Sequence, residues 1–329
     1  MTLRVGIIGL GRIAWGYDGG HWDSTAPALT HASCFARHPD TELVAAYDPV
    51  TEARAAFRTG HAGNAQVALH DDLDAFLKEN LDLVAIASPS EHHALHIAAC
   101  LDANVPRLWI EKPVTLKLDD YSRLLERIQS MPQPPRTCVN YPRRALPQLA
   151  EMKRHLASSQ TRPENISIAV NYSRQLAVNG VHMLDLLSAL TGATEVPPLD
   201  YLRKGPNGNP QFGFSLAGHP VTVTGHDLPY HLIELSITDG RGRLSLVRGG
   251  RDLVWEKAVP NPGYPGFFHL APPQGLEGVE DGETAMNQSM YRMLCSLADP
   301  QAPELSTFET AWFAQALLES VSARGGLAA

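Results

Sequence analysis

A short apolar strand pattern that ends in two glycines constrains the fold of this chain most. Val5 to Ile8 has the composition of a buried strand, and Gly9-Leu10-Gly11-Arg12-Ile13-Ala14 follows it. In this G-x-G-x-x-A pattern Gly9 permits a tight turn, Gly11 lets the backbone approach a pyrophosphate, and Ala14 lets a helix pack closely on the strand. We expect a helix from Arg12 onward, with the free N–H groups of its first turn facing the phosphates. Similar turns occur without a ligand, so the pattern needs support from the rest of the chain.

The composition argues against several classes of protein. The 329 residues suffice for two domains with their own cores. A formal net charge of −8, without blocks of Lys and Arg, argues against nucleic acid or an anionic membrane as the main partner. The four cysteines are widely scattered, so neither a disulfide framework nor a metal site is expected. No signal peptide or membrane-span pattern is recognised, which favours a cytoplasmic protein.

Strand and helix patterns alternate up to Tyr141. Strands are expected at 41–48, 81–87, 107–110 and 137–141, with helices at 30–38, 51–57, 71–77 and 94–103. This alternation predicts an α/β Rossmann domain over residues 1–141, with a doubly wound parallel sheet and ligands at the strand carboxyl ends. Later strand patterns are separated by hairpin turns, so residues 142–329 are expected to form a substrate-binding α+β domain with a large, mainly antiparallel sheet.

Asp48 ends the second expected strand. An acidic side chain there can accept hydrogen bonds from the ribose hydroxyls, and it disfavours the 2′-phosphate of NADP. The gap from the glycines is nearly double the usual ~20 residues, and an insertion over residues 15–27 accounts for the excess. Tyr17, His21 and Trp22 of this insertion are candidates for substrate selectivity. Asp48 could instead only begin a turn with Pro49; the ribose role predicts NAD, with NADP not excluded.

Three segments together resemble the Gfo/Idh/MocA oxidoreductases, the family of glucose–fructose oxidoreductase and inositol dehydrogenase. They are the glycine turn, Ser88-Pro89-Ser90-Glu91-His92-His93, and Glu111-Lys112-Pro113. The resemblance implies a NAD(P)-dependent oxidoreductase that acts on CH–OH groups of a sugar, cyclitol or sugar derivative. Ser90 departs from the family pattern, which usually has asparagine. The implied cofactor contacts are Gly9, Gly11, Arg12, Ile13, Asp48, Ser88, Pro89, His93, Glu111 and Lys112.

Lys112 has the most specific implied role. In the family the lysine of E-K-P projects between nicotinamide and substrate. Its place between an apolar strand and Pro113 agrees with that role, because a partly desolvated lysine has a lowered pKa and can move a proton. The simpler interpretation is a solvated surface lysine.

A second segment with candidate catalytic residues precedes an apolar helical stripe that ends at Gly192. Its Gly180, His182 and Asp185 match the family's G-x-H-x-x-D pattern, which implies that His182 shares proton transfer with Lys112. A core or helix-capping histidine is the alternative. Val178 stands where many family dehydrogenases have an aspartate, so no carboxylate–histidine dyad is available here. The expected substrate contacts are Lys112, Tyr172, Asn179 and His182.

Two alternatives to an NAD-dependent dehydrogenase remain at this point. A catalytically weak or silent regulator of the same fold could bind NAD or a sugar. An enzyme could also use NAD for redox-neutral glycoside processing. The resemblance further implies a sugar-like small-molecule substrate and a homo-oligomer formed through the C-terminal sheet. The composition predicts no nucleic acid, membrane or metal partner.

Overall fold

The computed structural model describes residues 2–18, 27–60, 66–159, 162–205, 208–276 and 278–325. His21 and Trp22 of the insertion therefore lie outside the described residues. The chain forms two compact units: residues 1–145 with 287–311, and residues 146–286 with 312–329. The expected boundary after residue 141 is close to residue 145, where the chain first passes from one unit to the other. One boundary does not describe the chain, however, because Met290, Met293 and Leu294 of helix α8 (Gly282–Ala298) are buried in the core of the first unit.

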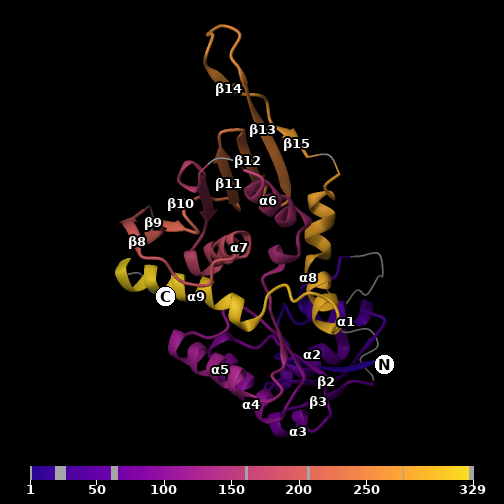
Figure 1. The fold of residues 1–329 in the computed structure, drawn as a ribbon. Coiled ribbons are helices and arrows are strands. Elements are labelled where there is room, and N and C mark those ends of the chain that lie inside the picture. Colours follow the sequence, from indigo (N-terminus) through magenta and orange to yellow (C-terminus); the bar gives the residue numbers. More distant parts are fainter. Residues whose placement is uncertain are drawn as a thin grey trace. The chain divides into compact units, whose positions relative to one another are not determined.

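The first unit contains the predicted doubly wound parallel sheet (Figure 1). Its strand order is β3-β2-β1-β4-β5-β6, with all neighbours parallel, as in dinucleotide-binding folds. Since β1 and β4 are neighbours, the segments that follow them meet at the same edge of the sheet. The strands are β1 (Leu3–Ile8), β2 (Thr41–Tyr47), β3 (Ala68–His70), β4 (Leu83–Ile86), β5 (Arg107–Ile110) and β6 (Arg136–Val139).

The helices of the first unit agree with the expected pattern, except for α5, which the sequence analysis did not identify. Thr30 caps α1 in a capping box, accepting from the Ser33 N–H, and Asp72 caps α3 by accepting from the Ala75 N–H. The helices are α1 (His31–Arg37), α2 (Thr51–Gly60), α3 (Leu73–Leu77), α4 (His93–Asp102) and α5 (Leu118–Ser130).

The helix expected from Arg12 is absent, and that prediction was wrong. Residues 11–15 form turns, in which the Ala14 N–H donates to the Gly11 carbonyl, and a single 3₁₀ turn follows at Gly16–Asp18. Gly16 and Asp18 favour turns over a continuing helix. The α-helix that packs after this strand begins only at His31. The glycine turn therefore presents backbone N–H groups without the dipole of a long helix.

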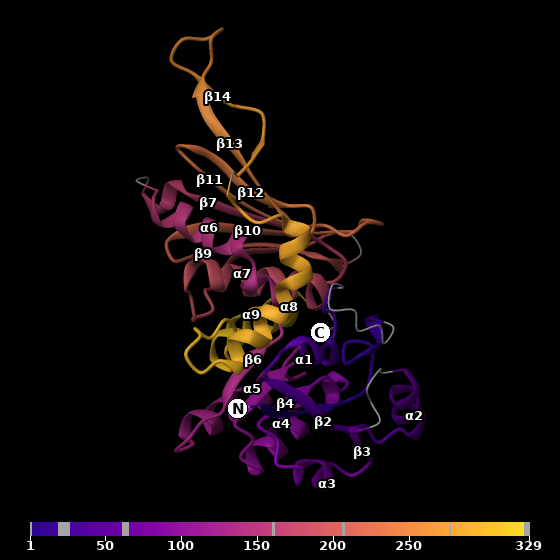
Figure 2. The ribbon, with the colours of Figure 1, turned by 90° about the vertical axis from the view of Figure 1, so that its right-hand side faces the viewer.

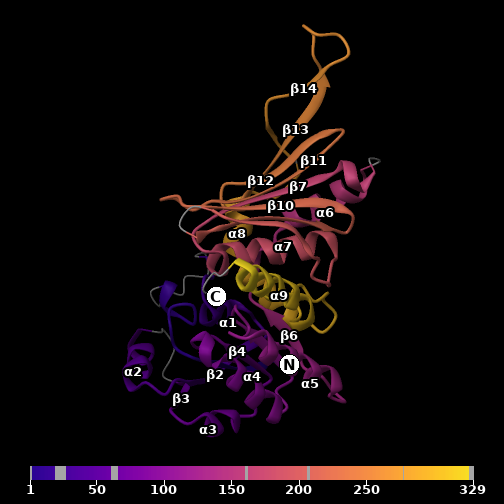
Figure 3. The ribbon, with the colours of Figure 1, turned by 90° about the vertical axis from the view of Figure 1, so that its left-hand side faces the viewer.

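The second unit contains a mainly antiparallel nine-stranded sheet, as predicted. Its order is β14-β13-β12-β11-β7-β10-β9-β8; β15 pairs with β13, and β7 and β10 form the parallel pair. Helix α7 (Val181–Thr191) lies along one face of the sheet, beside α6 (Pro147–Ala157) (Figures 2 and 3). Helix α9 (Phe308–Gly325) enters this unit at Trp312. The strands are β7 (Ser167–Ser173), β8 (Leu199–Lys204), β9 (Pro210–Leu216), β10 (His219–His226), β11 (Ile233–Asp239), β12 (Gly242–Val247), β13 (Asp252–Pro260), β14 (Phe268–Leu270) and β15 (Gln274–Gly275).

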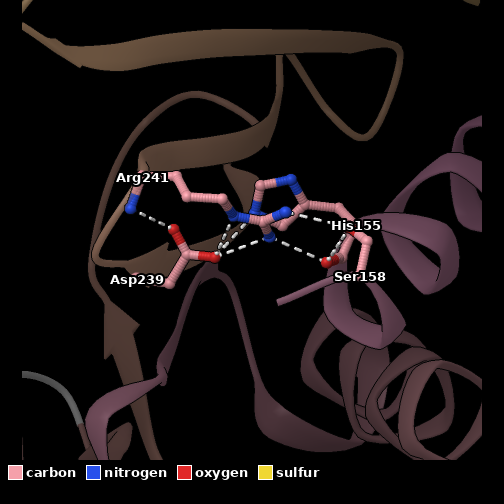
Figure 4. Close-up of polar contacts among 4 residues, drawn as sticks. All are labelled: His155, Ser158, Asp239 and Arg241. Atoms are coloured by element: carbon pink, nitrogen blue, oxygen red, sulfur yellow. Dashed lines mark hydrogen bonds and ion pairs between the residues drawn. The ribbon is translucent and has the colours of Figure 1, made fainter. Parts of the chain in front are cut away.

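A polar cluster ties the end of α6 to the β11–β12 turn (Figure 4). The Arg241 guanidinium donates to Asp239 Oδ2 at 2.6 Å, to the His155 carbonyl at 2.8 Å and to Ser158 Oγ at 2.9 Å. Burial alone would raise the pKa of Asp239, but the hydrogen bonds from Arg241 outweigh it and lower that pKa. Because the cation also meets a carbonyl in the last turn of α6, it stabilises that helix end.

Among the described residues, no helix is long and apolar enough to cross a membrane.

Candidate active site

A cavity of about 640 Å³ lies at the carboxyl ends of β1, β2 and β4 in the first unit. This volume is within the range of small-molecule and cofactor sites. The structure brings together here the predicted residues of the glycine turn, Asp48 and the segment after β4. The lining residues are Gly9, Leu10, Gly11, Arg12, Ile13, Tyr47, Asp48, Pro49, Val50, Ala53, Ala87, Ser88, Pro89, His92, Leu95 and His96.

The two glycines have different physical roles. Gly9 has φ +88°, and a Cβ on it would lie 2.5 Å from both the nitrogen and the Cα of Ser88. Only glycine fits, because two backbones touch and the conformation is left-handed. A Cβ on Gly11 would meet nothing within 4 Å. Gly11 therefore borders open space in the cavity, which fits the close approach of a dinucleotide pyrophosphate.

Asp48 has the turn role that the sequence left open, and it also lines the cavity. Its Oδ2 accepts the Leu10 N–H at 2.9 Å, and its Oδ1 accepts the Val50 N–H at 2.9 Å. The carboxylate thus fixes the glycine turn and begins its own turn, while it also lines the cavity. Its negative charge beside the cavity fits a ribose diol better than a phosphate.

His93 is held in the interior rather than among the cavity-lining residues. It is 1% exposed, with Nδ1 2.8 Å from the Pro113 carbonyl oxygen and Nε2 2.8 Å from the Ser88 carbonyl oxygen. The ring joins the segment after β4 to the segment after β5. This geometry gives His93 a positioning role in place of the predicted cofactor contact.

The neighbouring histidines line the cavity instead. His96 Nδ1 lies 2.8 Å from Ser88 Oγ. Burial, helped by His92 and His93, lowers the pKa of His96 to about 4, so this side chain is neutral at physiological pH. His96 was not among the predicted site residues, although it lies four residues after His92, the N-cap residue of α4, and side chains at that spacing share one helix face.

Glu111 is anchored by two residues that the sequence analysis did not assign to the site. Its Oε1 lies 3.0 Å from His31 Nε2 and 2.5 Å from Asn140 Nδ2. His31 is fully buried, and its ring packs edge-on against Trp109 at 4.2 Å between centroids. Glu111 is itself buried and does not line the cavity. Its contacts therefore fix the start of the Glu111-Lys112-Pro113 turn.

Lys112 has the properties expected of a partly desolvated amine. Burial lowers its pKa; the Arg143 cation lowers it further, and the Glu111 carboxylate opposes both. No hydrogen bond or ion pair joins its ammonium to another residue in the described part of the chain. A lysine without such a partner is available to exchange a proton with a ligand.

In the second unit, His182 lies in the first turn of α7, after a π-helical turn at Leu176–Gly180. Gly180 allows close packing there, since a Cβ on it would lie 3.2 Å from the Tyr172 ring. The Asn179 side-chain amide donates to the Ser173 carbonyl at 2.9 Å and lies 3.3 Å from His231 Nδ1. His182 is half-buried, while Asn179 is largely committed to contacts inside the unit.

Tyr172 is buried in the core, in contrast to the prediction that it contacts substrate. Its side chain is fully buried, and a Cβ on Gly225 would lie 2.5 Å from its hydroxyl. Burial raises the pKa of this phenol well above its usual value. The structure therefore places Tyr172 in the core, because its ring fills the space beneath two glycines.

Within the described residues, no group of three or more His, Cys, Asp or Glu side chains is arranged to hold a metal ion. The four cysteines are free.

Comparisons with known proteins agree with this architecture. Residues 3–134 match the family described as "Oxidoreductase family, NAD-binding Rossmann fold" (GFO_IDH_MocA). No curated protein matches the sequence. Similar solved structures include a dehydrogenase from Chromobacterium violaceum, with 14% identity and TM-score 0.73, covering 98% of this chain and 95% of that one.

Two further structures are similar. UDP-N-acetylglucosamine 3-dehydrogenase GnnA from Acidithiobacillus ferrooxidans has 16% identity and TM-score 0.66, covering 98% of this chain and 97% of its own. The transcriptional regulator Gal80p from Kluyveromyces lactis has 16% identity and TM-score 0.71, covering 99% and 89%. At these identities the likeness establishes the fold, which both a dehydrogenase and a regulator share.

The two glycines provide the first test of the cavity. Gly9→Ala forces a Cβ into the Ser88 backbone in a left-handed conformation, and we expect it to lower the free energy of unfolding by about 2–5 kcal/mol. Gly11→Ala should leave stability within about 0.5 kcal/mol, yet weaken NAD binding at least tenfold. Denaturant unfolding and calorimetric titration measure the two effects. Equal losses of stability in both variants would contradict the distinction.

The charges around Lys112 provide a second test, with opposite signs. Glu111→Gln removes the carboxylate that raises the pKa of Lys112, so the neutral amine should form at lower pH than in the wild type. Arg143→Gln removes a cation that lowers this pKa, so the neutral amine should form at higher pH. The pH dependence of chemical modification of Lys112, followed by peptide mass spectrometry, reports the shifts. Shifts in the same direction would show that these charges do not set the pKa.

Proposed function

Because residues 3–134 belong to the Gfo/Idh/MocA family of NAD-binding oxidoreductases, we propose that this chain oxidises or reduces a hydroxyl-bearing carbon of a sugar, cyclitol or sugar derivative. The observation that carries this proposal is Lys112. It is a half-buried amine with a lowered pKa and no hydrogen-bond or ion-pair partner among the described residues. It follows β5, which is the neighbour of β4 in the sheet whose strand ends form the cavity.

Different cavity residues hold different parts of NAD. The Gly9–Gly11 turn receives the pyrophosphate, and Asp48 accepts hydrogen bonds from the ribose diol. Ser88 and Pro89 bound the cavity on the side of β4. When bound, NAD supplies a ring carbon that accepts or gives a hydride.

Lys112 moves the hydroxyl proton. In the oxidation direction its neutral amine accepts the proton from the substrate hydroxyl, and in the reduction direction its ammonium returns it. The lowered pKa raises the neutral fraction of the amine near physiological pH. The anchored Glu111 carboxylate keeps the Lys112 turn in place through His31 and Asn140.

His182 is the second proton-transfer residue of the proposal. It lies in the first turn of α7, and an imidazole is a side chain that can both give and accept a proton in general acid–base chemistry. Val178 is 40% exposed and offers no carboxylate to orient that imidazole. Lys112 therefore carries the larger share of proton transfer.

The proposal is tested with a panel of sugars, inositols and nucleotide sugars, incubated with NAD or NADP and followed at the reduced-nicotinamide absorbance band. We expect turnover on at least one substrate. Lys112→Met should lower kcat about 10²–10⁴-fold while NAD still binds. Lys117→Met is the matched control, since Lys117 is an exposed lysine five residues further on, and it should retain full activity.

Other outcomes would favour the alternatives. NAD or sugar binding without turnover on the whole panel would favour a regulator, a use of the fold that Gal80p illustrates. Release of a free sugar from a glycoside without net reduced nicotinamide would favour redox-neutral chemistry. Full activity of Lys112→Met would contradict the mechanism itself.

Asp48 sets the choice between NAD and NADP in this proposal. Asp48→Asn removes the charge at nearly constant shape, so the affinity for NADP relative to NAD should rise about tenfold or more, as expected for a like-charge contact near the surface. Calorimetric titration with each cofactor measures this ratio. Asp71→Asn is the control, because Asp71 is exposed and does not line the cavity. An unchanged ratio in Asp48→Asn would contradict the role.

A further inference from the structure

Another cavity, of about 960 Å³, lies at the amino-terminal edge of the parallel sheet in the first unit. Leu3 at the start of β1, Asp82 just before β4 and Arg107 at the start of β5 line it. The candidate active site lies at the carboxyl ends of β1 and β4, so the two cavities are at opposite ends of these strands. The volume of the new cavity is at the upper end of the range for small-molecule sites.

The opposite wall of this cavity comes from the end of α8 and the segment that follows it. Arg292 and Ser296 line it one helical turn apart. The guanidinium of Arg136 donates to the carbonyls of Ser296 at 3.0 Å, Pro300 at 3.1 Å and Ala302 at 3.1 Å. These bonds satisfy carbonyls at the end of α8 and fix the segment after it. The wall is therefore preformed, which lowers the ordering cost of binding.

Arg107 is a partly buried cation whose hydrogen-bonding capacity is unused. Its Nε is buried without an acceptor, and in the described parts of the chain no hydrogen bond or ion pair reaches its guanidinium. Arginine stays charged at physiological pH. A buried donor without an acceptor costs free energy, so its presence in a native fold calls for an explanation. A ligand that supplies the acceptor explains it.

The acidic residues of the lining limit the charge that this ligand can carry. Asp82 Oδ2 already accepts the Arg4 N–H at 2.8 Å, and Asp299 Oδ1 accepts the Gln301 N–H at 2.9 Å. Asp40 also lines the cavity and is exposed. These carboxylates repel a dianion such as phosphate more strongly than a monoanion. A single carboxylate is also the group that matches the fork of a guanidinium.

The rest of the lining is largely apolar. It includes Leu3, Ala298, Pro300, Pro303 and Leu305. Such a surface favours a ligand with an apolar body, because binding then removes apolar area from water on both sides.

We propose that this cavity binds a small organic monocarboxylate with an apolar body. The carboxylate accepts two hydrogen bonds from the Arg107 guanidinium, and the apolar body lies against the segment after α8. This inference is independent of the proposed enzymatic function.

Benzoate is the probe, titrated into the full chain and followed by ligand-observed NMR relaxation. We expect a Kd of about 1 mM or lower, which is the range for a ligand of so few atoms. Benzamide has nearly the same shape without the charge, and it should bind at least about tenfold more weakly. Absence of benzoate binding up to about 10 mM, or equal affinities for benzoate and benzamide, would overturn the proposal.

Two variants locate the binding. Arg107→Met keeps an apolar stem of similar length but removes the charge, so the Kd for benzoate should rise at least about tenfold. Ala302→Trp leaves Arg107 in place and fills the cavity, so it should also block binding. Arg123→Met is the matched control, because Arg123 is an exposed arginine of α5 that does not line the cavity, and it should bind benzoate like the wild type. Circular dichroism verifies that all variants are folded. An unchanged affinity for benzoate in folded Arg107→Met or Ala302→Trp protein would overturn the proposal.

Discussion

The contact between the Gly9 and Ser88 backbones is the constraint on which the crevice of the first unit depends. It exists because β1 and β4 are parallel neighbours whose chains turn at the same edge of the sheet. The Ser88 carbonyl is held in turn by His93, whose other ring nitrogen holds the Pro113 carbonyl. The glycine turn, the segment after β4 and the lysine turn after β5 are thereby linked through backbone contacts and one imidazole.

The buried Glu111 carboxylate beside these contacts is compensated by hydrogen bonds. A buried carboxylate is costly unless hydrogen bonds compensate for its lost hydration. Glu111 receives such bonds from Asn140 and His31, and both partners meet the same oxygen. The carboxylate is therefore fixed without pairing to the adjacent Lys112, and it offsets only part of the desolvation of that amine.

Sequence patterns predicted those features of the fold and the site that depend on neighbouring residues and on sheet topology. The parallel alternation placed Gly9, Asp48 and Ser88 at one sheet edge, because carboxyl ends of parallel strands meet there. Residues that act across long separations gave no signal. His31 reaches Glu111 over 80 positions, after an insertion that also replaces the expected helix with turns. Tyr172 illustrates the opposite failure: it is among the expected substrate contacts, but packing beneath Gly180 and Gly225 buries the ring.

The energetic state of Lys112 favours an enzyme over a silent binding protein. Holding a cationic amine away from water without a hydrogen-bond partner lowers stability, and replacement by a hydrophobic side chain of similar size would remove that cost. Perturbed amines of this kind are concentrated at functional sites, where the lowered pKa serves proton transfer. The adjacent Glu111 carboxylate does not pair with this lysine, because its oxygen is shared by His31 and Asn140.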